Sequence, residues 1–134
     1  MDFKLRNGEQ VRTVLATKDT ATVIEAGDLV TLSSGIIIKA VAGSAAIAYT
    51  PKGAPAGVTE VEVTVGNDFE LIGTAENVFA VDQKGTEVDL VGTTTLLIDN
   101  NATVTDVFKV AIDKNAGTVG STASVVVKIN KPLF

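Results

Sequence analysis

The stretch from Ala21 to Ala42, ATVIEAGDLVTLSSGIIIKAVA, carries the clearest structural pattern of this chain. Two apolar runs within it, Leu29–Leu32 and Ile36–Ile38, have strand length and are rich in β-branched residues. The Ser-Ser-Gly sequence at 33–35 supplies a turn, because glycine adopts a positive φ without steric cost. A further strand is expected at Thr22–Glu25, before the reversal at Ala26-Gly27-Asp28. The stretch therefore predicts three short strands joined by tight turns.

The rest of the chain repeats this pattern of short apolar runs separated by turn residues. The further expected strands are Val11–Ala16, Ala45–Thr50, Val58–Val65, Phe69–Ile72, Val78–Val81, Thr86–Val91, Thr94–Ile98, Val104–Ile112 and Ser124–Ile129. In Val58–Val65 the valines at 61, 63 and 65 share one face, while Glu60, Glu62 and Thr64 share the other. The loop 82–85 is expected to join Val78–Val81 and Thr86–Val91 as a hairpin. The pattern predicts an all-β fold, a small β-sandwich or barrel of about ten to twelve short, mainly antiparallel strands with little helix.

A length of 134 residues fits one domain, which we expect to span residues 11–134. Residues 1–10 form either an N-terminal arm or a first hairpin, because Asn7-Gly8 favours a tight turn. Pro51–Gly57 contains two prolines and two glycines, so it is either a long connection or a contact loop.

The composition narrows the class of protein. Hydrophobic residues make up 46% of the chain and aromatic residues 4%, so Val, Ile, Leu and Ala must build the core. There is no cysteine, which rules out disulfides and thiolate metal sites and favours synthesis in the cytoplasm. The first ten residues do not resemble a signal peptide, and no apolar run approaches the roughly 18 residues of a membrane span.

The charge is unevenly distributed along the chain. The net charge is -5, but residues 60–113 carry eleven acids and two lysines, while residues 114–134 carry three lysines and no acid. An acidic middle segment argues against nucleic acid or an anionic membrane as a partner, since both require positive potential. A solvated acidic face that aids solubility is the simplest interpretation.

The residue types give little support for catalysis. The chain has neither His nor Cys, and it lacks the glycine-rich phosphate motifs and the G-x-S-x-G motif of hydrolases. Glu60 and Glu62 would lie about 7 Å apart on one strand face, within glycosidase range, but such a pair is also typical of a solvated strand. We expect no enzyme, no catalytic or metal-binding residues and no cofactor.

The aromatic residues fall into two groups. Phe69, Phe79 and Phe108 lie in expected strands and are expected in the core. Phe3 and Phe134 stand at the chain ends, where they are either packed back on the domain or offered to a neighbouring molecule.

The segments Ala26–Leu32 (AGDLVTL) and Gly35–Ala40 (GIIIKA) resemble the capsid decoration, or cement, proteins of tailed bacteriophages. The alanine-rich run Ala45–Thr50, the loop Pro51–Gly57 and the closing segment Ser124–Pro132 are similar to the same family. These segments cover about half of the chain, and they are structural rather than catalytic.

The resemblance implies a structural protein of the virion, made in the host cytoplasm, that binds the outer surface of a phage capsid. It would bridge and stabilise subunits of the major capsid protein as a homo-oligomer, with a trimer favoured, and would bind neither nucleic acid nor membrane. The expected partner-binding residues are Asp2, Phe3, Lys4, Leu5, Arg6, Pro51, Lys52, Pro55 and Phe134. Gly27, Asp28 and Gly35 are expected to form the turns of the scaffold.

Two other functions remain open from the sequence. A carbohydrate-binding or adhesin-like β-sandwich module could use the Pro51–Gly57 loop, since many such domains share this composition. A hydrolase would have to depend on Glu60 and Glu62.

Overall fold

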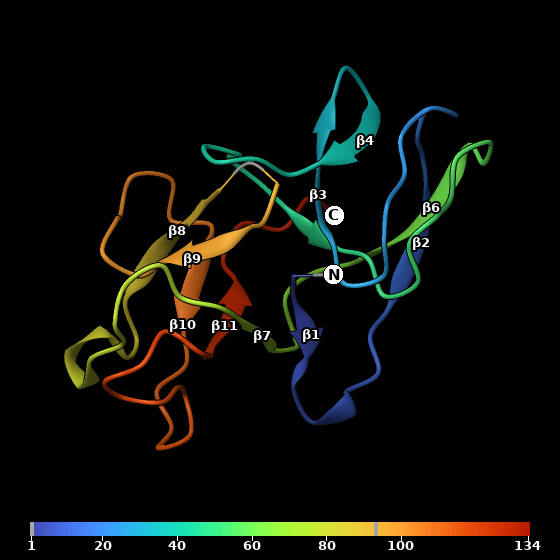
Figure 1. Cartoon of the computed structure of the whole chain (residues 1–134). Helices are drawn as coiled ribbons and strands as arrows, with labels where there is room; N and C mark the ends of the chain where they lie inside the picture. Colours follow the sequence, from blue (N-terminus) through green and yellow to red (C-terminus); the bar gives the residue numbers. More distant parts are fainter. Residues whose placement is uncertain (1, 93) are drawn as a thin grey trace.

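The computed structural model describes residues 2–92 and 94–134, and over these residues the chain is built from short antiparallel strands (Figure 1). The strands are β1 (Lys4–Leu5), β2 (Thr13–Thr17), β3 (Leu29–Ser33), β4 (Ile36–Lys39), β5 (Ala48–Tyr49), β6 (Glu60–Thr64), β7 (Leu71–Gly73), β8 (Glu87–Val91), β9 (Leu97–Asp99), β10 (Phe108–Val110) and β11 (Val125–Ile129). Two single-turn 3₁₀ helices, η1 (Arg6–Gly8) and η2 (Val81–Gln83), complete the described elements. The predicted all-β class, with about ten to twelve short strands, is confirmed.

The strands form three sheets. The largest has the order β1-β7-β11-β10-β8-β9, and the two smaller sheets have the orders β2-β6 and β4-β3-β5. The chain directly after β7 returns to the far edge of the large sheet, where Ala75 bridges Ile98 of β9. The large sheet is therefore strongly curled around its core, although the described strands do not close into a barrel. Figure 1 shows β7 to β11 of this sheet on the left with β1 near the middle, the β3–β4 hairpin above, and the β2-β6 ribbon on the right.

The hairpin predicted at the centre of the opening stretch is confirmed as β3 and β4. Ser33 pairs with Ile36, and the two turn residues between them, Ser34 and Gly35, have φ values of +51° and +80°. Two successive positive φ values give a turn whose twist matches the twist of the flanking strands. The strand expected at Thr22–Glu25 is wrong, because that segment forms a single bridge between Ile24 and Ala54 and the rest of it is loop.

The β4-β3-β5 sheet is buried on both faces where β3 begins, and it is exposed toward the β3–β4 turn. Leu29 and Val30 are adjacent on β3 and both are fully buried, yet their side chains point to opposite faces and join different cores. The larger core also contains the strand residues of the curled sheet, and the smaller core consists of Ile24, Val30, Ile37, Ala48, Ala54, Val61 and Val63. This sheet is thus the layer that both cores share.

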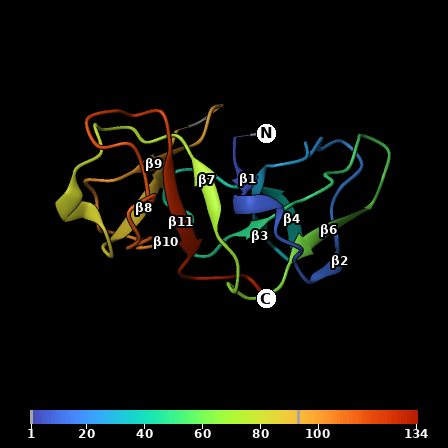
Figure 2. The ribbon, with the colours of Figure 1, turned by 90° about the horizontal axis from the view of Figure 1, so that it is seen from below.

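The two ends of the chain tie the large sheet to the smaller ones. After β11, the backbone of Lys131 and Leu133 bonds to Ile47, and the carbonyl of Phe134 accepts a hydrogen bond from the N–H of Gly66 (2.7 Å). At the other end, β1 pairs with β7, and the N–H of Phe3 donates to the carbonyl of Gly27. Figure 2 accordingly shows β1 and the C-terminus between the two halves of the molecule.

Phe3 lies in the larger core. Of the two alternatives that the sequence left open, it is therefore packed back on the domain and not offered to a neighbouring molecule. Its ring is 3% exposed and stacks on Phe108 with ring centroids 5.6 Å apart. Gly73 faces the same ring, and a Cβ at this position would collide with Phe3. Phe69 and Phe79 are also buried, as expected, whereas Phe134 keeps 42% of its surface exposed.

The predicted hairpin of Val78–Val81 with Thr86–Val91 is wrong in its first strand. Residues 78–80 have no strand structure, and η2 follows them. The side-chain oxygen of Gln83 accepts hydrogen bonds from the N–H of Ala80 (3.0 Å) and from Nδ2 of Asn100 (2.8 Å). A side-chain amide thus accepts the hydrogen bond of a backbone N–H that would otherwise have paired with a neighbouring strand.

The face of β6 that carries Glu60 and Glu62 is not exposed along its whole length, because Thr64, the third residue predicted on this face, is 1% exposed. Its hydroxyl oxygen accepts a hydrogen bond from the N–H of Tyr49 (2.9 Å), so the end of β6 is covered by β5. Periodicity alone does not predict this burial, because the covering strand is distant in sequence.

The two terminal phenylalanines provide a matched test of this packing. We expect Phe3→Ala to lower the free energy of unfolding by about 3 to 5 kcal/mol, because it empties a buried aromatic site next to Phe108. Phe134→Ala removes a side chain that is 42% exposed and should cost less than about 1 kcal/mol. Urea denaturation followed by circular dichroism measures both, and equal losses would contradict the burial of Phe3.

Candidate functional site

A groove of about 560 Å³ runs between the N-terminal segment and the start of the Pro51–Gly57 loop. Its lining residues, which we call the N-terminal groove, are Leu5, Glu9, Gln10, Val11, Thr13, Pro51, Lys52 and Glu62. Three of the predicted partner-binding residues, Leu5, Pro51 and Lys52, therefore meet at one surface although the first is more than forty positions from the other two in the sequence. We take this groove as the candidate site.

The first wall of the groove is fixed by Arg6. Its guanidinium bonds to Glu70 (3.0 Å) and forms a bidentate pair with Asp113 (2.9 and 2.7 Å). The turn that follows, with positive φ at Asn7 and Gly8, reverses the chain toward the groove. These contacts tie η1 to the large sheet, so this wall does not depend on a bound partner for its position.

The ion pair at Arg6 shifts the acidity of its partner. The hydrogen bonds from the Arg6 guanidinium hold the pKa of Asp113 well below its usual range, although partial desolvation opposes this shift. Behind the wall, burial raises the pKa of Tyr49, and a hydrogen bond from the backbone of Leu5 partly offsets that rise. The carboxylate of Asp113 thus stays ionised under mildly acidic conditions.

The second wall is held by the turn at 26–28. The N–H of Gly27 donates to the carbonyl of Thr50 (2.8 Å), and the N–H of Thr50 donates to the carbonyl of Asp28 (3.0 Å). Gly53, with φ +69°, passes so close to the backbone of Ile24 that a Cβ would not fit. Since Gly27 also accepts the hydrogen bond from Phe3, this one turn is tied to both walls.

The charges that line the groove are largely paired within the chain. A carboxylate oxygen of Glu9 accepts the N–H of Glu70 (2.9 Å). The ammonium of Lys52 lies 3.4 Å from Glu62, which also accepts a weak hydrogen bond from the hydroxyl of Thr13 (3.5 Å). Both Lys52 and Glu62 remain solvent-accessible enough to exchange partners, because exposed ion pairs of this kind are weak.

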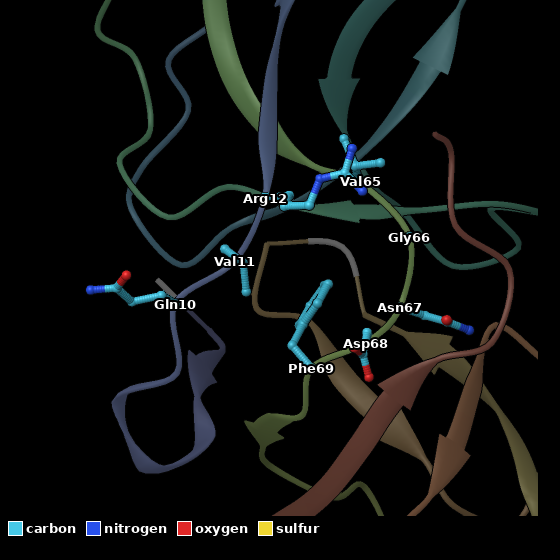
Figure 3. Close-up of a pocket in the computed structure, with 8 residues that line it drawn as sticks. All are labelled: Gln10, Val11, Arg12, Val65, Gly66, Asn67, Asp68 and Phe69. Atoms are coloured by element: carbon cyan, nitrogen blue, oxygen red, sulfur yellow. The ribbon is translucent and has the colours of Figure 1, made fainter.

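A second hollow of about 350 Å³ adjoins the groove, and Gln10 and Val11 line both (Figure 3). Figure 3 shows Phe69 and Val11 pointing toward each other, with Gln10 pointing away from them. Arg12 lines this hollow as well, is exposed, and forms no ion pair with any described residue. It is the unpaired positive charge next to the groove.

The remaining predicted partner-binding residues lie elsewhere. Asp2 accepts a hydrogen bond from the N–H of Leu96 (3.0 Å), and Phe3 is buried, so both are used within the chain. Lys4 and Pro55 are exposed but do not line the groove, and Phe134 is partly exposed at the end of the chain. The turn residues occupy the positions expected of them, with φ +91° at Gly27, φ +80° at Gly35 and a buried Asp28 that accepts the N–H of Glu25.

The acidic pair Glu60 and Glu62 does not gather into one site. Glu62 faces the groove and Lys52, while Glu60 is exposed and lies outside the groove. Within residues 2–92 and 94–134, no cluster of three or more Asp, Glu, His or Cys side chains could hold a metal ion. The described residues also include no helix that is long and apolar enough to cross a membrane.

Sequence reasoning missed the segment that runs from the end of the arm into the start of β2, namely Glu9, Gln10, Val11, Arg12 and Thr13. The available signal was Asn7-Gly8, since a turn at this point directs the following residues back across Leu5. What the sequence lacked was the position of Pro51 and Glu62 opposite them, which depends on strand pairing. Comparisons of the chain with protein-family models, curated proteins and solved structures gave no match.

The Arg6 contacts predict a specific pH dependence of the first wall. Because the pKa of Asp113 is lowered in the folded chain, the contribution of the pair is complete above the usual pKa of an aspartate. It is lost only as the pH falls through the lowered value. We therefore expect the protection of the Arg6 amide, which donates to Glu70, to be the same at pH 4 as at pH 7 once the intrinsic exchange rate at each pH is divided out.

Arg6→Ala should accelerate exchange at the amides of residues 4 and 6 at every pH, because the pair no longer restrains η1. Hydrogen exchange followed by NMR measures this. Lys109→Ala is the matched control, since Lys109 is exposed and has no ion pair with a described residue. Equal acceleration in both variants would show that Arg6 does not hold this wall.

Proposed function

We propose that this chain is a structural protein that binds the outer surface of a phage capsid and bridges subunits of the major capsid protein. It would be made in the host cytoplasm and act in the virion, as a homo-oligomer for which a trimer is favoured. The N-terminal groove would contact the shell, and no catalytic step would be needed.

The observation that carries the proposal is the position of the turn Ala26-Gly27-Asp28. This turn belongs to the segment that resembles the decoration proteins, and its backbone bonds to Phe3 and Thr50, at the start of each wall of the groove. A segment with the family's structural pattern thus supports the surface at which three of the expected contact residues meet. This is the arrangement that a scaffold with attached contact elements requires.

The packing of the chain ends agrees with a load-bearing role. Both ends pair with strands of the same chain, and η1, which follows β1, is tied to Glu70 and Asp113 by the ion pairs of Arg6. Force applied at the groove would be carried by several hydrogen bonds and ion pairs in parallel. A protein that holds neighbouring shell subunits together benefits from such a frame.

Binding to shells tests the proposal. Isolated expanded shells of the phage that encodes this chain should take up the purified protein at micromolar concentration, as seen by co-sedimentation and negative-stain imaging. Lys52→Glu should weaken binding by about tenfold or more, because it reverses an exposed charge beside Glu62 in the groove.

Lys109→Glu is the matched control, since it makes the same charge reversal at an exposed residue on the large sheet, outside the groove. Binding by Lys109→Glu should equal that of the unmodified protein. Failure of the unmodified protein to add to shells, together with binding to a glycan array, would replace the proposal with the carbohydrate-binding alternative.

A further inference from the structure

The exposed edges of the three sheets differ in how they are protected. An edge strand presents unpaired N–H and C=O groups, which can pair with a strand of another chain unless they are covered or flanked by charge. The edge of β9 is covered by Ala75 and that of β5 by Pro132. Beside β1, the N–H of Phe3 is bonded to Gly27.

Two more edges carry charged residues. The backbone of β6 that faces away from β2 belongs to Glu60, Glu62 and Thr64, so two carboxylates stand along it. On β4, the residues that face away from β3 are Ile37, which bridges Lys18, and Lys39. Charged side chains on an edge discourage pairing with further strands.

The edge of β2 differs from these, because it is uncovered and the residues whose backbone faces outward along it are uncharged. The carbonyl of Arg12 accepts the N–H of Val65, and the N–H of Lys18 donates to Thr59, so even-numbered residues from 12 to 18 face β6. Alternation along the strand then turns the backbone groups of Val11, Thr13 and Leu15 away from β6. We call these three residues the open edge.

The open edge is uncharged, and it is partly accessible at Val11 and Thr13 and exposed at Leu15. None of its residues is charged, and Leu15 is 64% exposed. The bridge between Lys18 and Ile37 covers β2 only beyond Thr17. Within residues 2–92 and 94–134, this is the one sheet edge that is neither covered nor flanked by charged strand residues.

The open edge is continuous with the N-terminal groove. Val11 and Thr13 belong to both, so a segment laid along β2 would enter the groove at Thr13. Arg12 lies between these two residues, is exposed and is unpaired among the described residues. An acidic side chain on the incoming segment would complement it.

We propose that the open edge accepts an extended segment of a partner protein as an additional β-strand, with an uncharged, β-branched centre and an acidic residue that pairs with Arg12. Backbone hydrogen bonds to Val11, Thr13 and Leu15 provide the affinity, and Arg12 sets the register. The identity of the partner as a shell subunit rests on the proposed function, whereas the strand pairing does not.

A second copy of this chain is a poorer occupant of the edge. Antiparallel pairing of two open edges centred on Thr13 would bring two Arg12 side chains within a few residues of each other. The nearest groove carboxylates, Glu9 and Glu62, already have partners in their own chain. Charge complementarity therefore favours a different, acidic segment.

Amide hydrogen exchange of the labelled full chain tests the pairing directly. Without a partner, the amides of Thr13 and Leu15 should exchange faster than those of Val14 and Ala16, which face β6. The probe is the capped peptide Glu-Val-Thr-Val-Thr-Val-Glu at up to millimolar concentration. We expect it to slow exchange at Val11, Thr13 and Leu15 by at least about tenfold, and to leave Val14 and Ala16 unchanged.

Two variants separate pairing from nonspecific binding. Leu15→Pro removes an N–H that the chain itself does not use, so the β2–β6 ladder should persist while protection by the peptide is lost. Arg12→Glu should weaken binding of the acidic peptide and strengthen binding of its counterpart with lysine at both ends. Lys109→Glu, the matched charge reversal on the large sheet, should change neither.

Several results would overturn the inference. They are unchanged exchange at the open edge in saturating peptide, no reversal of peptide preference in Arg12→Glu, or protection that rises with protein concentration alone. Shell binding separates the two proposals. If Leu15→Pro binds shells as well as the unmodified protein does, the open edge is not the contact to the shell, and the proposed function stands. If the intact chain pairs with the peptide but not with shells, the proposed function is overturned and the open edge stands.

Discussion

The burial of two adjacent residues on opposite faces of one small sheet is the constraint on which the rest of the structure depends. Leu29 and Val30 follow each other on β3, so their side chains must point in opposite directions, and both are fully buried. One core therefore has to form on each side of β3. The curled six-stranded sheet provides the first, and the β2-β6 ribbon provides the second.

This arrangement explains how the chain ends are used. Two cores on either side of a narrow sheet leave few direct contacts between the outer sheets, and the terminal segments supply them. Phe3 enters the larger core beside Phe108, while Leu133 pairs with Ile47 and packs against the smaller core. The N-terminal groove is the surface that results where the first of these segments crosses from one half to the other.

The turn at Gly27 connects this architecture to the proposed binding surface. Its carbonyl and its N–H bond to two segments that are 47 positions apart, Phe3 and Thr50, which begin the two walls of the groove. The geometry of the groove therefore depends on the turn that leads into β3 of the central sheet. Arg6 adds a second restraint on the same wall through two carboxylates. A surface held in this way suits binding that depends on shape and register more than on induced fit.

The sequence by itself determined the all-β class, the β3–β4 hairpin with its turn at Gly35, and the inward position of Phe69 and Phe108, because these follow from local periodicity and turn chemistry. It also identified Leu5 and Lys52 as candidate contact residues. Only the tertiary structure decided that these two meet in one groove, and that Thr64 is buried under β5. The physical reason is that strand pairing joins residues far apart in the chain, and neither hydrophobic alternation nor turn residues specify which strand becomes the neighbour.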